Sequence, residues 1–338
     1  NQRTPERQQS SHAESCMSHK LYPGSVISKT APTVTGPVDG EGGSASGIWT
    51  IEQADYYIAN GTWPQPKLLG AIYGAGSNTF GELGNGTQSA YSSPIQTGSK
   101  SNWNAVSASA YSTYGIDASN ALWSWGYNAH GELGLGNITN YSTPKQVGAL
   151  TNWQTLSTGK FSVGAIKTDG TLWTWGIGLY GVLGQGSTTY YSSPKQLGTL
   201  TNWLRISTGK YFMAAIKTDG TLWSWGQNNN GQLGLGNTTY YSSPKQIGVL
   251  TNWKYISTGS NHCLAVKTDG TLWAWGNNYQ GRLGLNNSTY YSSPKQVGSL
   301  TNWLYVSGAY ASSFAIKTDG TMWSWGANLY GSLGVGST

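Results

Sequence analysis

The chain is poor in charge, in cysteine and in long apolar runs, and each shortage excludes a class of protein. Only 9% of its 338 residues are charged, against about 25% in an ordinary soluble domain. No apolar run approaches the roughly 18 residues that a membrane-spanning helix needs. The two cysteines, Cys16 and Cys263, form neither a CxxC pair nor a zinc spacing and do not identify a redox compartment.

Glycine and aromatic residues are abundant instead, with 48 Gly, 17 Trp and 22 Tyr. The glycines lack a three-residue period, which argues against collagen, and the aromatic content argues against a disordered chain. We therefore expect a β-rich, turn-rich domain with an aromatic core. The N-terminus shows no apolar signal segment, and because it begins with Asn1 we expect either processing or a true start at Met17.

A repeat of 50 residues organises most of the chain. Five Asn-Trp pairs, five Trp-x-Trp-Gly motifs and five Ser/Thr-Pro steps recur in register, and Gly-x-Leu-Gly occurs six times. The tryptophans of these motifs account for 15 of the 17 in the chain, and we expect them to pack as core between units. The Trp-x-Trp pairs stand at residues 123/125, 173/175, 223/225, 273/275 and 323/325.

One unit, residues 203–248, predicts four short strands. The first three are expected over 203–207, 213–218 and 222–226, and the fourth is expected to open at Pro244, where proline is tolerated. Asp219-Gly220 between two apolar runs predicts a hairpin turn. Four short strands per unit indicate the blades of a β-propeller.

These motifs resemble the regulator-of-chromosome-condensation repeat, on the string AIKTDGTLWSWGQNNNGQLGLGNTTYYSSPKQIG over residues 215–248. The resemblance covers residues 69–338 and implies an all-β propeller. The unit count gives 21 strands, so we expect about six four-stranded blades, with seven as the alternative. Strands donated by the N-terminal segment could complete the sixth blade.

The first 68 residues differ from the repeats. Residues 1–47 form a Gly/Ser/Pro-rich segment that we expect to be an extended arm, tied either to its own propeller or, preferably, to neighbouring subunits. Residues 48–68 form a linker or anchor segment. The patch Gly42–Pro64 resembles a segment of bacteriophage virion and tail proteins, and the alternative is a linker helix on the propeller's own side. The anchor candidates are Ile48, Trp49, Ile51 and Trp63.

The sequence offers no recognisable catalytic, cofactor or metal site. Four aspartates share the Lys-Thr-Asp-Gly turn, and the four histidines lack metal spacing. No GxxxxGK[ST] motif occurs, and GxLGxG does not open a helix as a dinucleotide site requires. We therefore expect no enzymatic activity and no cofactor.

Positive charge is concentrated in the repeats, where residues 69–338 carry 14 Lys and Arg against 7 Asp and Glu. Four lysines after the Ser/Thr-Pro step have no adjacent acid, so we expect them to form an arc that attracts an anionic polymer such as nucleic acid or surface polysaccharide. Simple solubility is the alternative. These residues are Lys145, Lys195, Lys245 and Lys295.

Positions that differ between units are the candidates for partner binding, because recognition surfaces are built on variable loops of a rigid scaffold. One variable set, which includes Phe161, Tyr211, His262 and Tyr310, precedes the Ala-Ile-Lys strand. The other follows Trp-Gly, and from it we select Tyr127, His130, Tyr180, Asn230, Tyr279, Arg282 and Tyr330.

These observations lead to a preferred functional hypothesis and two alternatives. The preferred one is a structural or adhesive protein of a virus particle, in an oligomeric assembly and without membrane insertion, whose arm binds other virion subunits. The first alternative is a cellular regulator, because the resemblance implies binding to a small GTPase or to chromatin. The second is a secreted propeller that binds glycan or inhibits an enzyme, for which seven Asn-x-Ser/Thr sequons give weak support.

Overall fold

The computed structural model describes residues 70–328 and 331–336, which belong to the compact unit Leu69–Thr338. The described residues form six antiparallel sheets, as the repeat predicts. Four sheets have four strands, the first has two and the last has three, so the predicted count of 21 strands is confirmed. The arm at 1–47 and the linker at 48–68, with the anchor candidates, lie outside the described residues.

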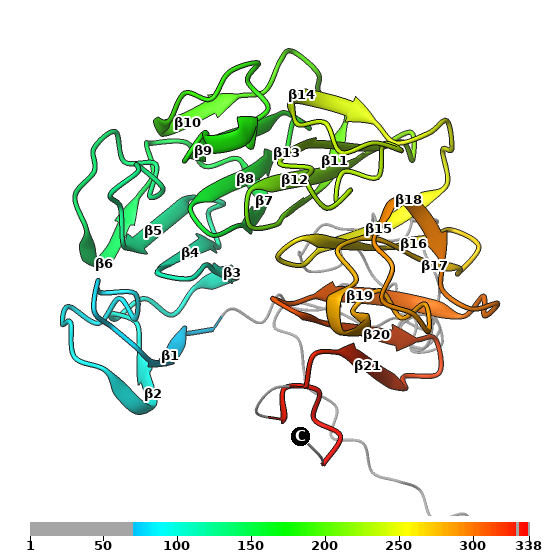
Figure 1. Ribbon diagram of the computed structural model, residues 1–338. Coiled ribbons are helices and arrows are strands. Elements are labelled where there is room, and N and C mark those ends of the chain that lie inside the picture. Colours follow the sequence, from blue (N-terminus) through cyan, green and yellow to red (C-terminus); the bar gives the residue numbers. More distant parts are fainter. Residues whose placement is uncertain (1–69, 329–330, 337–338) are drawn as a thin grey trace, which may run out of the picture. The chain divides into compact units, whose positions relative to one another are not determined.

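The strands follow one another along the chain in a fixed order within each sheet (Figure 1). The first sheet contains β1 (Tyr73–Gly76) and β2 (Tyr91–Gln96), and the last contains β19 (Trp303–Gly308), β20 (Ser312–Lys317) and β21 (Met322–Gly326). The complete sheets contain β3 (Trp103–Ala108), β4 (Ser112–Asp117), β5 (Leu122–Gly126) and β6 (Tyr141–Gln146); β7 (Trp153–Thr158), β8 (Ser162–Lys167), β9 (Leu172–Gly176) and β10 (Tyr191–Gln196); β11 (Trp203–Thr208), β12 (Phe212–Lys217), β13 (Leu222–Gly226) and β14 (Tyr241–Gln246); and β15 (Trp253–Thr258), β16 (His262–Lys267), β17 (Leu272–Gly276) and β18 (Tyr291–Gln296). Figure 1 shows β6, β10, β14 and β18 at the outer edges of their sheets.

The Asp-Gly turns form as the sequence predicts. Asp219 Oδ1 accepts hydrogen bonds from the backbone N–H and the hydroxyl of Thr221, at 2.9 and 2.6 Å. Gly220 has a φ of +75°, which a residue with a side chain rarely adopts. The same bonds recur at Asp169, Asp269 and Asp319, so these carboxylates shape turns.

The predicted start of the fourth strand at Pro244 is wrong, because β14 begins three residues earlier, at Tyr241. The pairing of β13 with β14 shifts register between Ser224 and Gly226, so the ladder is irregular where the proline stands. Strand β14 is also the outer strand of its sheet, where a missing N–H leaves no neighbouring strand unpaired.

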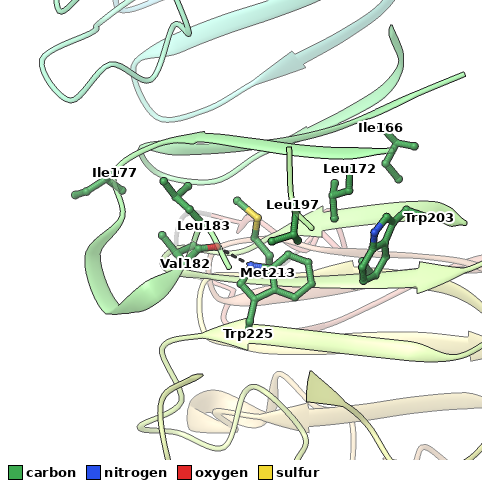
Figure 2. Packing of buried hydrophobic residues seen from close by; sticks show 10 residues of the cluster. Ile166, Leu172, Ile177, Val182, Leu183, Leu197, Trp203, Met213 and Trp225 are labelled. Carbon is green, nitrogen blue, oxygen red and sulfur yellow. Dashed lines mark hydrogen bonds between the residues drawn. The ribbon is translucent and has the colours of Figure 1, made fainter. Parts of the chain in front are cut away.

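The apolar core lies between consecutive sheets. Figure 2 shows Ile166 and Leu172 of one sheet in a cluster with Trp203, Met213 and Trp225 of the next. Equivalent clusters recur between the neighbouring complete sheets. Removing a tryptophan from such a site costs roughly 3–5 kcal/mol, so these contacts contribute strongly to holding the sheets together.

A repeated hydrogen bond fastens each sheet to the one before it. Trp225 Nε1 donates to the backbone oxygen of Val182, 43 residues earlier, at 2.8 Å (Figure 2). The acceptor always belongs to the variable residue of Gly-x-Leu-Gly in the preceding unit. The equivalent bonds join Trp125 to Glu82, Trp175 to Glu132, Trp275 to Gln232 and Trp325 to Arg282.

Candidate functional site

The turns between the first and second strands of five sheets converge on one side of the unit Leu69–Thr338. They surround a hollow of about 390 Å³ whose lining includes Ala110, Lys160, Lys210, Ser260 and Tyr310. The loops that follow Trp-Gly open on the same side, because strands alternate in direction within each sheet. We call this side the axial face: the turns 109–111, 159–161, 209–211, 259–261 and 309–311, with the loops after Trp-Gly.

Hydroxyl groups hold the inner strands together beneath the axial face. The side chains of Ser207 and Thr258 share a hydrogen bond of 2.9 Å between neighbouring sheets, and Ser107 and Thr158 share another of the same length. The backbone N–H of Gly308 donates to Ser257 Oγ at 2.9 Å. The hollow therefore has a rigid rim, since its turns are tied from sheet to sheet.

Aromatic side chains gather on the axial face around Tyr127 and His130. The Tyr127 ring lies 4.8 Å from Phe80 and 5.9 Å from Phe161, between ring centroids. The His130 ring lies 5.1 Å from Phe161 and 6.0 Å from Tyr190. Rings from three units thus form one cluster, which includes two of the predicted partner-binding residues.

Tyr180 forms a second aromatic group, with ring centroids 5.5 Å from both Tyr211 and Tyr240. Tyr180 lies in the turn η1 (Leu179–Gly181) with a φ of +60°, which is strained for a residue with a side chain. Strained residues cluster at functional sites. The residue with the unfavourable backbone conformation is therefore the one whose ring contacts Tyr211 and Tyr240.

Arg282 and Tyr279 share the third group. Arg282 Nε donates to the backbone oxygen of Tyr279 at 2.9 Å. Burial lowers the pKa of Arg282, while the nearby Tyr290, Tyr310 and Tyr279 act in the opposite direction. Tyr279 and Tyr310 are 60% and 77% exposed, so this group presents aromatic surface to solvent.

The remaining predicted site residues are placed differently. The backbone N–H of Asn230 donates to Gln232 Oε1 at 2.8 Å, so Asn230 belongs to the hydrogen bonding of its own loop. Tyr330 lies outside the described residues. His262 is a correction, because it is the first residue of β16 and is fully buried instead of lying on a loop.

Two lysines at the hollow were missed in the sequence. Lys160 Nζ lies 4.9 Å from the Phe161 ring and Lys210 Nζ lies 5.4 Å from Tyr211. The equivalent positions hold Ala110, Ser260 and Tyr310, so variation between units was the signal that could have found them.

The axial face carries little negative charge. Of the seven carboxylates in residues 69–338, only Glu82 and Glu132 stand in the loops after Trp-Gly or their equivalent in the first unit. Glu132 is buried, and Glu82 accepts hydrogen bonds from Ser77 and from the backbone of Phe80. The exposed aspartates stand in the Asp-Gly turns at the opposite ends of the strands.

The predicted lysine arc lies elsewhere, on the outer strands. Lys145, Lys195, Lys245 and Lys295 are all exposed and occupy equivalent positions of β6, β10, β14 and β18. Among residues 70–328 and 331–336, no group of three or more His, Cys, Asp or Glu could hold a metal ion. No helix in that same part of the chain is long and apolar enough to cross a membrane.

The RCC1-like domain family matches residues 69–338. The human protein WBSCR16 has a similar structure, with a TM-score of 0.65 and 19% identity over 74% of this chain and 68% of its own. Prp20p from Saccharomyces cerevisiae, whose structure was described with its binding to Gsp1p and histones, gives a TM-score of 0.67 and 21% identity over 78% and 67% of the two chains. No curated protein matches. These findings give the virion hypothesis no support.

Proposed function

Because the chain belongs to the RCC1-like domain family, we propose that it is a non-enzymatic binding protein that holds a partner protein on its axial face. One observation carries the proposal: Lys160, Lys210 and the exposed Tyr310 line a hollow whose rim is tied from sheet to sheet, and further exposed aromatic rings lie on the same face. Exposed aromatic residues are enriched where proteins bind one another, and a rigid rim lowers the entropic cost of binding.

The charge of the axial face favours a partner with an acidic and apolar surface. Lys160 and Lys210 attract carboxylates, while a strongly basic partner would find no exposed aspartate there. Prp20p is the relative with stated partners, Gsp1p and histones. Gsp1p is therefore the first protein to test, and histones serve as the basic comparison.

The test measures binding of purified Gsp1p by calorimetry to the protein and to two variants that reverse the same number of charges. Lys160→Glu/Lys210→Glu changes the axial face, and Lys245→Glu/Lys295→Glu changes the outer strands. We expect the axial variant to weaken binding at least tenfold and the outer variant to change it less than twofold.

Equal losses in the two variants would locate binding away from the axial face. Tighter binding of histones than of Gsp1p would contradict the acidic partner. If neither protein binds, partners are captured by cross-linking through Tyr310→Cys in a Cys16→Ser background. The amount captured is then compared between the axial variant and the outer variant. Capture that survives the axial variant would overturn the proposal.

A further inference from the structure

A second kind of hollow recurs with the 50-residue period, on the side of the Asp-Gly turns, and the axial face does not explain it. One hollow, of about 430 Å³, lies between two sheets and is lined by Leu197, Leu200, Trp203, Lys217, Trp223 and Pro244 among others. Another, of about 370 Å³, is lined by residues fifty positions later: Ile247, Leu250, Trp253, Lys267, Trp273 and Pro294.

The lysine of each hollow is a buried cation without a carboxylate. Lys217 is 6% exposed, and its Nζ lies 3.9 Å from the centre of the Trp223 ring and 4.9 Å from that of Trp203. Within the described residues, neither Lys217 nor Lys267 has an acidic group within 4.0 Å. Burial lowers the pKa of Lys217, and the charge of Asp219, two residues on, opposes this in part. An incoming anion would therefore find an ammonium group that makes no direct ion pair.

An unpaired donor lies in the wall of the same hollow. Trp203 is 3% exposed, and its Nε1 has no acceptor among the described residues. Figure 2 shows the nitrogen-bearing edge of Trp203 turned toward Leu172 and Leu197, and Leu197 lines the hollow. Trp253 repeats this in the next unit, so each hollow offers one indole N–H and one ammonium group.

In β3–β6 a carboxylate stands beside the cation that lies over the tryptophans. Asp117 stands at the position of Lys217, and its Oδ2 accepts hydrogen bonds from Lys100 Nζ at 2.6 Å and from Trp123 Nε1 at 2.9 Å. Lys100 Nζ also lies 3.9 Å from the Trp123 ring. A cation over this tryptophan pair thus binds a carboxylate in the one sheet where the sequence provides it.

We propose that the hollows at Lys217 and Lys267 bind carboxylated sugar units of an acidic polysaccharide. Indole, leucine and proline surfaces suit the apolar face of a pyranose ring, the ammonium group takes its carboxylate, and the indole N–H takes a hydroxyl oxygen. A polymer that carries one carboxylate in each repeating unit matches sites that recur with the protein repeat, because linked sites raise the effective concentration.

The test measures binding of an oligosaccharide of glucuronic acid by calorimetry, with its carboxyl-reduced glucose form as the neutral probe. We expect the acidic probe to bind at least tenfold more tightly. Lys217→Met/Lys267→Met keeps the apolar stems and should weaken binding at least tenfold, whereas Lys245→Met/Lys295→Met should change it less than twofold.

A second variant guards against misfolding. Leu200→Lys/Lys217→Asp copies the pair of Lys100 and Asp117 into β11–β14, so it supplies an internal carboxylate and should abolish binding at that hollow while the melting temperature is kept. Equal binding of both sugars, unchanged binding by this variant, or acetate binding as tightly as glucuronate would each overturn the proposal.

Discussion

Lys100 pairs with Asp117 and takes the place of a lysine that other sheets carry at the position of Asp117. In the next three sheets and the last one, a lysine at the end of the second strand lies over two tryptophans, as Lys217 does. In β3–β6 that position is Asp117, and Lys100 reaches the Trp123 ring at 3.9 Å while it pairs with Asp117 at 2.6 Å. Burial alone would raise the pKa of Asp117, but hydrogen bonds from Lys100, Ser119 and Trp123 outweigh it and hold that pKa well below its ordinary value.

The Lys100–Asp117 exchange predicts a compensating pair of mutations. Asp117→Lys places two cations together and should lower the free energy of unfolding by about 3 kcal/mol, as for other broken buried pairs. Lys100→Leu/Asp117→Lys installs the residues of the neighbouring sheet and should recover most of that loss. Urea unfolding measures both, and a double variant no more stable than the single one would refute the compensation.

The close packing of Gly234 against Trp275 predicts a difference between two glycines of the same motif. Gly234 and Gly334 have φ values of +71° and +67°, so alanine is strained at both, by about 1 kcal/mol. A Cβ at Gly234 would lie 2.8 Å from Trp275 Nε1, whereas a Cβ at Gly334 meets nothing within 4 Å.

Gly234→Ala should therefore lower the free energy of unfolding by about 2 kcal/mol more than Gly334→Ala, because it also opens the joint between two sheets. Denaturant unfolding of both variants gives the comparison. Equal losses would mean that the contact of a Cβ at Gly234 with Trp275 does not lower the free energy of unfolding.

The burial of His262 predicts that the folded state loses stability at pH values above those at which carboxylates titrate. Burial, assisted by the charge of Arg282, lowers the pKa of His262 to about 3. The unfolded chain binds this proton near pH 6.5, so stability is complete above that pH and is lost as pH falls toward 3. The slope is at most about 1.4 kcal/mol per pH unit.

A matched control for His262 exists one unit earlier, where Phe212 and Cys263 replace the pair of His262 and Ser313. His262 Nε2 lies 2.9 Å from Ser313 Oγ, and Ser313 donates to the backbone oxygen of Arg282. His262→Phe/Ser313→Cys keeps the other three histidines and should flatten the stability profile between pH 6.5 and 4. A slope that persists in the variant would assign it to another group.

Much of the fold could be predicted because the sequence pattern of each strand recurs in several units. The turn at Asp219 and the strand at 222–226 follow from local chemistry that every unit repeats. The start of β14 could not, because its pairing depends on a register shift opposite Gly226. The bond from Trp225 to Val182 also could not be predicted, since it depends on how two sheets pack.

Part of the candidate site could be predicted from the sequence. Tyr127 and His130 vary between units, which marked them, and the structure brings them into one cluster. Tyr190 recurs in later units and so resembled scaffold, although its ring lies beside His130. His262 was placed on a loop because the boundary of β16 falls at that residue, and a boundary decides between exposure and burial.

The bond between each Trp-Gly tryptophan and the preceding Gly-x-Leu-Gly carbonyl has an evolutionary consequence. Donor and acceptor lie in every full unit, and the acceptor is a backbone atom, so Glu82, Val182 and Arg282 serve equally. Duplicating or deleting one 50-residue unit would recreate the same joint at the new boundary. The length of such a gene can therefore change by recombination in whole units, without any matching mutation on the neighbouring surface.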